Sequence, residues 1–166
     1  LRPQHIYRAT IPLRRWLHRT PRPAGGPPPR ARVQLVREPG PHSAVRIGNA
    51  EDVWRLLRDE LGSSDRERFM VVLLDGAHHV AGIHEAAVGL VNSCNIHPRE
   101  VFKAAILGNA VAIIAVHNHP SGNTTPSLPD EAVTTQLREA GVLLGIPLLD
   151  HIIVTAESYR SLLHGV

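Results

Sequence analysis

The uneven distribution of proline most constrains what this 166-residue chain can fold into. Nine of the 14 prolines lie in residues 1–48, and three of them follow one another at 27–29, directly after Gly25 and Gly26. Each proline fixes φ and removes a backbone donor, so this density is incompatible with regular helix or sheet. We therefore expect residues 1–48 to form a poorly ordered arm, apart from a short strand at 33–36. The folded domain is expected to comprise residues 49–166.

Positive charge follows the same division. The arm holds 10 of the 18 basic residues, all arginine, and one acid, Glu38, whereas residues 49–166 hold 8 basic and 14 acidic residues. The net charge of +3 and the pI of 9.7 therefore average an arm of +9 and a domain of −6. Such an arm is suited to binding nucleic acid or an anionic membrane surface, resembles an organelle transit peptide in composition, or is simply a solvated extension.

Composition excludes several classes of protein. The 43% hydrophobic content supports a packed core, and no stretch approaches the roughly 18 consecutive apolar residues of a membrane helix. A single cysteine, Cys94, excludes an internal disulfide framework and a cysteine-rich zinc finger. Nothing requires an oxidising compartment, so we expect a cytoplasmic protein without a membrane partner. The sequence does not indicate an oligomeric state.

Residues 49–166 alternate helical and extended patterns. Helices are predicted at 50–61, 98–107, 128–144 and 157–163, and strands at 68–74, 79–90, 111–116 and 148–155. Asn49 and Ser127 are the expected N-caps of the first and third helices. This alternation predicts an α/β fold, a three-layer sandwich in which helices flank a mixed sheet.

The sharpest motif is His117-Asn118-His119-Pro120, directly after the apolar strand 111–116. Side chains at i and i+2 of an extended segment share a face, with Cα atoms about 7 Å apart, so both imidazoles can reach one metal ion. Asp130 follows His119 by 11 residues, at a helix N-terminus behind a turn-rich loop that can fold back. Two histidines and a carboxylate form a tetrahedral zinc site whose fourth position stays open for water, the catalytic pattern.

This ordered set, H-x-H-P followed by Ser127 and Asp130, resembles the JAMM signature of JAB/MPN-domain zinc metalloproteases. The stretch HNHPSGNTTPSLPDEAVTTQLREAGVLLGIPLLDHIIV is more closely similar to the RadC family of bacterial JAB-type proteins, as is the upstream NIHPREVFKAAILGNAVAIIAV. The resemblance covers residues 49–166 and implies the JAB/MPN fold, which is cytidine-deaminase-like. RadC proteins often carry a helix-hairpin-helix DNA-binding module, and residues 1–48 show no such pattern.

The resemblance implies a role for each matching residue. His117, His119 and Asp130 would bind Zn²⁺, and Ser127 would stabilise the oxyanion of a tetrahedral intermediate. An upstream glutamate of the family acts as general base on the zinc-bound water, and Glu67 matches it here.

Several of these residues have plainer interpretations. Glu67 is also a surface charge in a charged segment, and Glu85, on the neighbouring strand, is the alternative base. Ser127 and Asp130 could serve only as helix caps. The pair Asp150-His151 inside an apolar strand is either a second layer around the metal or a hydrogen-bonded core pair. Cys94 is a fourth ligand in principle but more simply a small thiol.

The sequence therefore predicts a zinc-dependent hydrolase that cleaves peptide or isopeptide bonds in a peptide or protein substrate. One alternative is a DNA-associated RadC-like protein, such as a repair accessory or a metal-dependent nuclease, which would use the arginine-rich arm. Another is a zinc-binding module without turnover. The net charge of −6 on the domain that carries the motif disfavours close phosphate contact.

Overall fold

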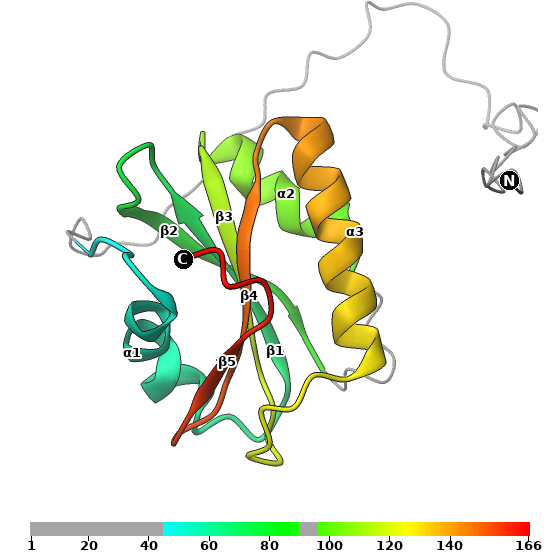
Figure 1. Ribbon diagram of the computed structural model, residues 1–166. Coiled ribbons are helices and arrows are strands. Elements are labelled where there is room, and N and C mark those ends of the chain that lie inside the picture. The colour runs from blue at the N-terminus through cyan, green and yellow to red at the C-terminus, as the bar shows by residue number, and fades with distance from the viewer. Residues whose placement is uncertain (1–44, 90–95) are drawn as a thin grey trace, which may run out of the picture. The chain divides into compact units, whose positions relative to one another are not determined.

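The computed structural model describes residues 45–89 and 96–166 (Figure 1). The predicted arm up to residue 44, its strand at 33–36 and Cys94 lie outside the described residues. Residues on the arm side of the predicted boundary take part in the fold. Ile47 is 1% exposed, and its amide donates to the His78 carbonyl at 2.9 Å.

The centre of the domain is one mixed sheet in the order β2-β1-β3-β4-β5. Its strands are β1 (Arg68–Leu74), β2 (Val80–Val88), β3 (Ala112–Asn118), β4 (Leu148–Val154) and β5 (Tyr159–Ser161). β3 and β4 run parallel, and the other neighbours are antiparallel. Because β3 is flanked on both sides and carries helices on both faces, all seven of its residues are buried.

Helices cover both faces of this sheet (Figure 1). α1 (Ala50–Leu61) lies on one face, and α2 (Pro98–Leu107) and α3 (Leu128–Leu144) lie on the other. Two separate apolar clusters result, one between the sheet and α1 and one between the sheet and the α2/α3 layer. The structure confirms the predicted α/β three-layer sandwich.

The two-residue period of the strands decides which side chains meet α3. In β3, Ile114 and Val116 pack in the cluster with α1, whereas Ile113 and Ala115 pack in the cluster with α2 and α3. His117 continues the second series, so it points toward the α3 side of the sheet. The start of α3 is thereby the part of the helical layer that His117 faces.

Both predicted N-caps form complete capping boxes. The Asn49 side chain accepts from the Asp52 amide, and the Asp52 carboxylate accepts from the Asn49 amide. Ser127 and Asp130 form the same reciprocal pair at the start of α3. Each box satisfies backbone donors that a helix N-terminus leaves without partners and fixes the direction in which the chain enters the helix.

The predicted final helix at 157–163 is wrong, because Tyr159–Ser161 form the edge strand β5. β5 pairs antiparallel with β4, from Ile152↔Ser161 to Val154↔Tyr159. A segment of seven residues gains little from helical hydrogen bonds, since nucleation of so short a helix is unfavourable. Pairing with β4 instead satisfies the backbone groups of a strand that is otherwise open on that side.

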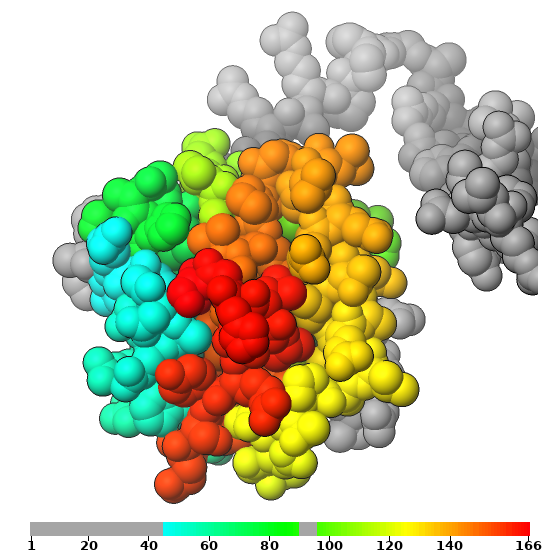
Figure 2. All heavy atoms as spheres, in the orientation of Figure 1, coloured from blue at the N-terminus to red at the C-terminus, as the bar shows by residue number. Residues whose placement is uncertain are grey.

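The residues after β5 seal the edge of the sandwich. Figure 2 shows this C-terminal segment on the surface between α1 and α3. Leu163 packs against the α2/α3 cluster and Val166 against the α1 cluster.

No helix within residues 45–89 and 96–166 combines the length and apolarity needed to cross a membrane.

A glycine fixes how closely α3 approaches the start of β4. A Cβ at Gly141 would lie 2.6 Å from the Ile146 carbonyl oxygen and 3.2 Å from the Leu148 amide nitrogen. Glycine to alanine in a helix ordinarily stabilises by about 1 kcal/mol. We expect Gly141→Ala instead to lower the free energy of unfolding by about 1–3 kcal/mol, because backbone must move. Urea unfolding measures this free energy, and Glu139→Ala, on the exposed face of α3, is the control. A Gly141→Ala protein that is more stable than the parent would contradict the close packing at Gly141.

Candidate metal centre

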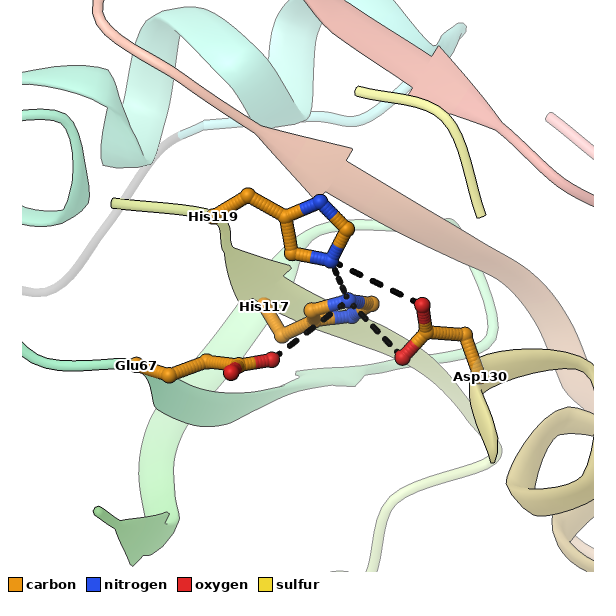
Figure 3. A group of neighbouring side chains, drawn as sticks. All are labelled: Glu67, His117, His119 and Asp130. Atoms are coloured by element: carbon orange, nitrogen blue, oxygen red, sulfur yellow. Dashed lines mark hydrogen bonds and ion pairs between the residues drawn. The ribbon is translucent and has the colours of Figure 1, made fainter. Parts of the chain in front are cut away.

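Four side chains that can ligate a metal converge at one end of the sheet (Figure 3). They are Glu67, directly before β1; His117 in β3; His119, directly after β3; and Asp130, in the first turn of α3. One donor atom from each lies within 4.8 Å of the donors of the other three. The structure thus brings together the four residues that the sequence analysis named as ligands or base.

Strand register explains why Glu67 belongs to the group. In the β1–β3 ladder Phe69 lies opposite His117. Glu67 precedes Phe69 by two residues and therefore shares the face of the sheet on which His117 lies. Its Oε1 is 4.0 Å from His117 Nε2.

Distances among the other three donors match one coordination shell. His117 Nε2 is 3.0 Å from His119 Nε2 and 3.3 Å from Asp130 Oδ1, and His119 Nε2 is 3.6 Å from Asp130 Oδ2. Bonds of about 2.0–2.2 Å in a tetrahedral zinc site place neighbouring donors about 3.3 Å apart. The donor spacing thus fits a small divalent ion.

Two side chains of the group are buried and two are slightly exposed. The side chains of His117 and Asp130 are 1% and 4% exposed, whereas those of His119 and Glu67 are 15% and 14% exposed. A metal held here would be anchored by the buried pair and approached from the side of the more exposed pair. This arrangement suits a site that admits a small reactant.

A hydrogen-bonded chain behind His117 fixes which of its nitrogens faces the group. The Thr134 hydroxyl donates to the Asp130 carbonyl at 2.6 Å, so it must accept from His151 Nδ1, also at 2.6 Å. His151 is fully buried and therefore neutral, which leaves its Nε2 to accept from His117 Nδ1 at 2.8 Å. With its proton on Nδ1, a neutral His117 directs the lone pair of Nε2 toward the group.

His119 is oriented in a similar way by backbone. Its Nδ1 lies 2.6 Å from the Asn123 carbonyl oxygen, which can only accept. Nδ1 therefore carries a proton, and Nε2 is the nitrogen that faces His117 and Asp130. Both histidines thus present Nε2 for ligation, with the other nitrogen occupied, as metal-binding histidines generally do.

Electrostatics favour the ligating protonation states of His117 and Asp130 but not that of His119. Burial lowers the pKa of His117, and burial holds the pKa of His151 well below its ordinary value. The hydrogen bond with Asp130 raises the pKa of His119. Burial opposes the ionisation of Asp130, but the close approach of His117 and His119 and the hydrogen bonds from the Ser127 hydroxyl and amide outweigh it, and the pKa of this carboxyl lies far below its usual range. These shifts keep the Asp130 carboxylate ionised and the His117 imidazole neutral, which are the protonation states that ligation requires, whereas at His119 a metal ion has to displace a proton.

Ser127 contacts the group through Asp130. Its Oγ donates to Asp130 Oδ2 at 2.6 Å and accepts from the Asp130 amide at 3.3 Å, while its own amide donates to Oδ2 at 2.7 Å. One rotamer thus caps α3 and orients the carboxylate. Asp130 Oδ1 is left directed at His117 Nε2.

The alternative base, Glu85, lies elsewhere. It pairs across the sheet with Met70, which packs in the α1 cluster, and its carboxylate forms an ion pair with Arg68. Arg68 also pairs with Glu60 of α1 at 2.6 Å. Of the two glutamates, Glu67 is therefore the one that the fold brings to the histidines.

In the Asp150-His151 pair, His151 supports the candidate ligand His117, whereas Asp150 forms hydrogen bonds within the core of the domain. The His151 ring holds His117, whereas the Asp150 carboxylate accepts from the Ser161 hydroxyl at 2.6 Å and from the Leu163 amide at 3.0 Å. Asp150 thus fastens the C-terminal segment to β4 and does not contact the His151 ring.

Two residues that contribute to the site were not predicted. Thr134 follows Asp130 by four residues, so helical spacing alone places both on one face of α3 and could have indicated it. Asn118, inside the motif itself, bonds to the segment around Glu67. Its contact with residues about 50 positions earlier depends on strand pairing and left no local signal.

Fold and site together define a JAB-type domain with a candidate metal centre. The sequence profile of the RadC-like JAB domain matches residues 47–165, and the chain therefore belongs to this family. The resemblance noted from the sequence is confirmed.

Curated relatives agree with this assignment. UPF0758 proteins of Moorella thermoacetica and Desulfitobacterium hafniense (strain DSM 10664 / DCB-2) are 50% and 47% identical over 120 and 116 residues. These matches cover 72% and 70% of this chain and 52% and 51% of the relatives. A UPF0758 protein of Rubrobacter xylanophilus is 43% identical over 136 residues, which cover 81% of this chain and 58% of that protein. The chain thus spans about half the length of the curated relatives that it matches.

Metal binding is testable by stability as well as by content. We expect zinc, as the probe, to bind with one ion per chain, and at about 100 times its dissociation constant to raise the free energy of unfolding by about 2.7 kcal/mol. His117→Ala and Asp130→Asn should lose the bound ion and the stabilisation, whereas His84→Ala, on the edge strand β2 and outside the group, should keep both. Elemental analysis and thermal unfolding measure this; equal zinc content in all four proteins would exclude the site.

The hydrogen-bonded chain through Thr134 and His151 to His117 gives a second prediction. His151→Leu removes the acceptor of His117 Nδ1, so we expect zinc affinity to fall by about 10–100-fold. His151→Gln can accept from His117 and donate to Thr134, and should recover most of the affinity. Competition with a chromophoric chelator measures the dissociation constants for zinc. Equal values for the Leu and Gln variants would show that the hydrogen bond from His117 to His151 does not support zinc binding.

Proposed function

We propose that this domain is a zinc-dependent hydrolase that cleaves peptide or isopeptide bonds. The observation that carries the proposal is the placement of Glu67 beside a three-donor group. His117, His119 and Asp130 have donor spacings suited to one ion, and Glu67 Oε1 lies 4.0 Å from His117 Nε2. Three protein ligands with an adjacent carboxylate are the composition of catalytic rather than structural zinc sites.

Zinc is the proposed metal because two imidazole nitrogens and one carboxylate oxygen suit it. His117, His119 and Asp130 would hold the ion. When bound, zinc lowers the pKa of a coordinated water to about 7 and polarises a carbonyl oxygen.

Glu67 is the proposed general base. Its side chain is 14% exposed and its Oε1 lies 4.0 Å from His117 Nε2, where it can accept a proton from the attacking water. The same oxygen can then deliver that proton to the leaving amine as the carbon–nitrogen bond breaks. Proton transfer by a positioned carboxylate contributes about 10²–10⁴-fold to such reactions.

Ser127 is proposed to serve two purposes. It holds Asp130 through Oδ2, and the hydroxyl of this exposed residue can also donate to the oxyanion of a tetrahedral intermediate. The second function requires the hydroxyl proton to turn from Asp130 to the substrate oxygen.

A peptide substrate is favoured over nucleic acid by the charges around the site. Residues 49–166 carry a net charge of −6. Arg68, which adjoins Glu67, is engaged by Glu60 and Glu85. A phosphodiester approaching this end of the sheet would meet Glu67 with little cationic compensation from these groups. A DNA-associated function through the arginine-rich arm, and zinc binding without turnover, are the alternatives that the experiment must separate.

The decisive variant is Glu67→Gln, which keeps the shape of the side chain and removes the base. We expect it to retain one zinc per chain and to lose about 10²–10⁴-fold in kcat on a peptide or isopeptide substrate. Glu85→Gln is the matched control and should hydrolyse at the parent rate. Fluorogenic peptide, isopeptide and single- and double-stranded DNA substrates are tested in parallel with the whole chain.

Each alternative gives a different result. Cleavage of DNA but not of peptides would replace the peptidase by a nuclease, and DNA binding with a steep salt dependence but no cleavage would favour the DNA-associated function. Zinc binding with no turnover of any substrate would favour the binding module. A Glu67→Gln protein that works at the parent rate would remove Glu67 from the mechanism.

A further inference from the structure

Asn118, the residue between the two histidines, hydrogen-bonds through its side-chain amide to the backbone of the segment that carries Glu67. Asn118 is 1% exposed. Its Oδ1 accepts from the Arg68 amide at 2.8 Å, and its Nδ2 donates to the Arg66 carbonyl at 3.0 Å. The side-chain amide therefore bonds to the residue before and the residue after Glu67. Only one orientation of the amide satisfies both bonds, because Arg66 offers an acceptor and Arg68 a donor.

This contact lies where the β1–β3 ladder ends. The last backbone pair is Phe69↔His117, while β3 continues to Asn118 in register with Val154 of β4. Beyond that pair the Asn118 side chain takes the place of a strand partner for residues 66–68. On the other side of the segment, the Gly89 amide donates to the Glu67 carbonyl at 2.9 Å. The backbone at Glu67 is thus held from both sides.

We propose that Asn118 is the positioning residue for Glu67: its amide fixes the backbone on both sides of the base, so that the Glu67 carboxylate stands beside the metal ligands. This inference rests on the proposed function, in which Glu67 is the base. It gives the middle position of the His-Asn-His motif a task distinct from ligation. Successive strand residues point to opposite faces, so Asn118 does not share the face on which the histidines meet Asp130, and its amide bonds instead to the backbone of Arg66 and Arg68.

The rival explanation is that Asn118 merely satisfies two buried backbone groups. A matched control separates the two. Thr155, 5% exposed at the end of β4, also bonds to backbone in both directions, accepting from the Ser158 amide and donating to the Ser158 carbonyl at 3.0 Å each. Thr155→Val removes a comparable pair of bonds without touching residues 66–68, so a loss of stability alone should affect it as much as Asn118→Leu.

Two measurements that do not depend on activity test the position of Glu67. In the cobalt-substituted whole chain, the paramagnetic shift of the Glu67 side-chain resonances reports how close the carboxylate lies to the metal. Hydrogen exchange at the Arg68 amide reports the bond to Asn118. We expect Asn118→Leu to reduce the shift and to accelerate this exchange by at least about tenfold, with Thr155→Val at parent values.

Kinetics supply the third measurement. Asn118→Leu should lower kcat by at least about tenfold, a part of the general-base contribution, while KM and zinc per chain stay at parent values. Thr155→Val should keep the parent kcat. An Asn118→Leu protein with parent kcat, or with an unchanged Glu67 shift, would overturn the proposal.

Failure of the proposed function gives a different pattern. If Glu67→Gln hydrolyses at the parent rate, or if the parent has no turnover, Glu67 is not an active base, yet the cobalt shift and the Arg68 exchange still decide whether Asn118 holds it. If Glu67→Gln is inactive and Asn118→Leu is fully active, the function stands and the positioning role of Asn118 is wrong.

Discussion

A hydrogen-bonded chain that begins at the backbone carbonyl of Asp130 is the interaction on which the metal centre depends. It passes through the Thr134 hydroxyl and the His151 ring to His117 Nδ1. Because the carbonyl can only accept, every proton along the chain has one possible place, and Nε2 of His117 is left to face the other donors. The chain also joins α3, β4 and β3, so the packing of three elements sets the chemistry of one nitrogen.

In this site, the side chains that can bind a metal and the side chains that orient them belong to two different sets of residues. Residues that face the group come from the ends of β3 and α3 and from the segment before β1, whereas the residues that support them lie one layer behind, in buried surroundings. Capping gives one example, because Ser127 satisfies the first turn of α3 and steers the Asp130 carboxylate with the same hydroxyl. Burial makes such bonds costly to break, since a buried polar group that loses its partner is destabilising.

Much of this organisation could be predicted from the residues, and the rest could not for a definite reason. The alternation of helices and strands, both capping boxes and the set His117, His119 and Asp130 depend on local period and short spacing. The final segment was expected to be helical and is a strand, because a partner strand distant in the fold decides its conformation. The choice between Glu67 and Glu85 follows from register, since only the residue two before Phe69 lies on the face of His117.

The sequence by itself thus determined the family, the α/β class, the concentration of positive charge in residues 1–48 and of negative charge in residues 49–166, and the residue types able to ligate a metal. The tertiary structure decided which glutamate stands beside the histidines, that His151 and Thr134 fix the protons of His117, and that Asn118 holds the segment around Glu67. These contacts join residues 17 to 52 positions apart. Periodicity and capping act within a few residues, whereas strand pairing brings such distant positions within hydrogen-bond reach only once the sheet has formed.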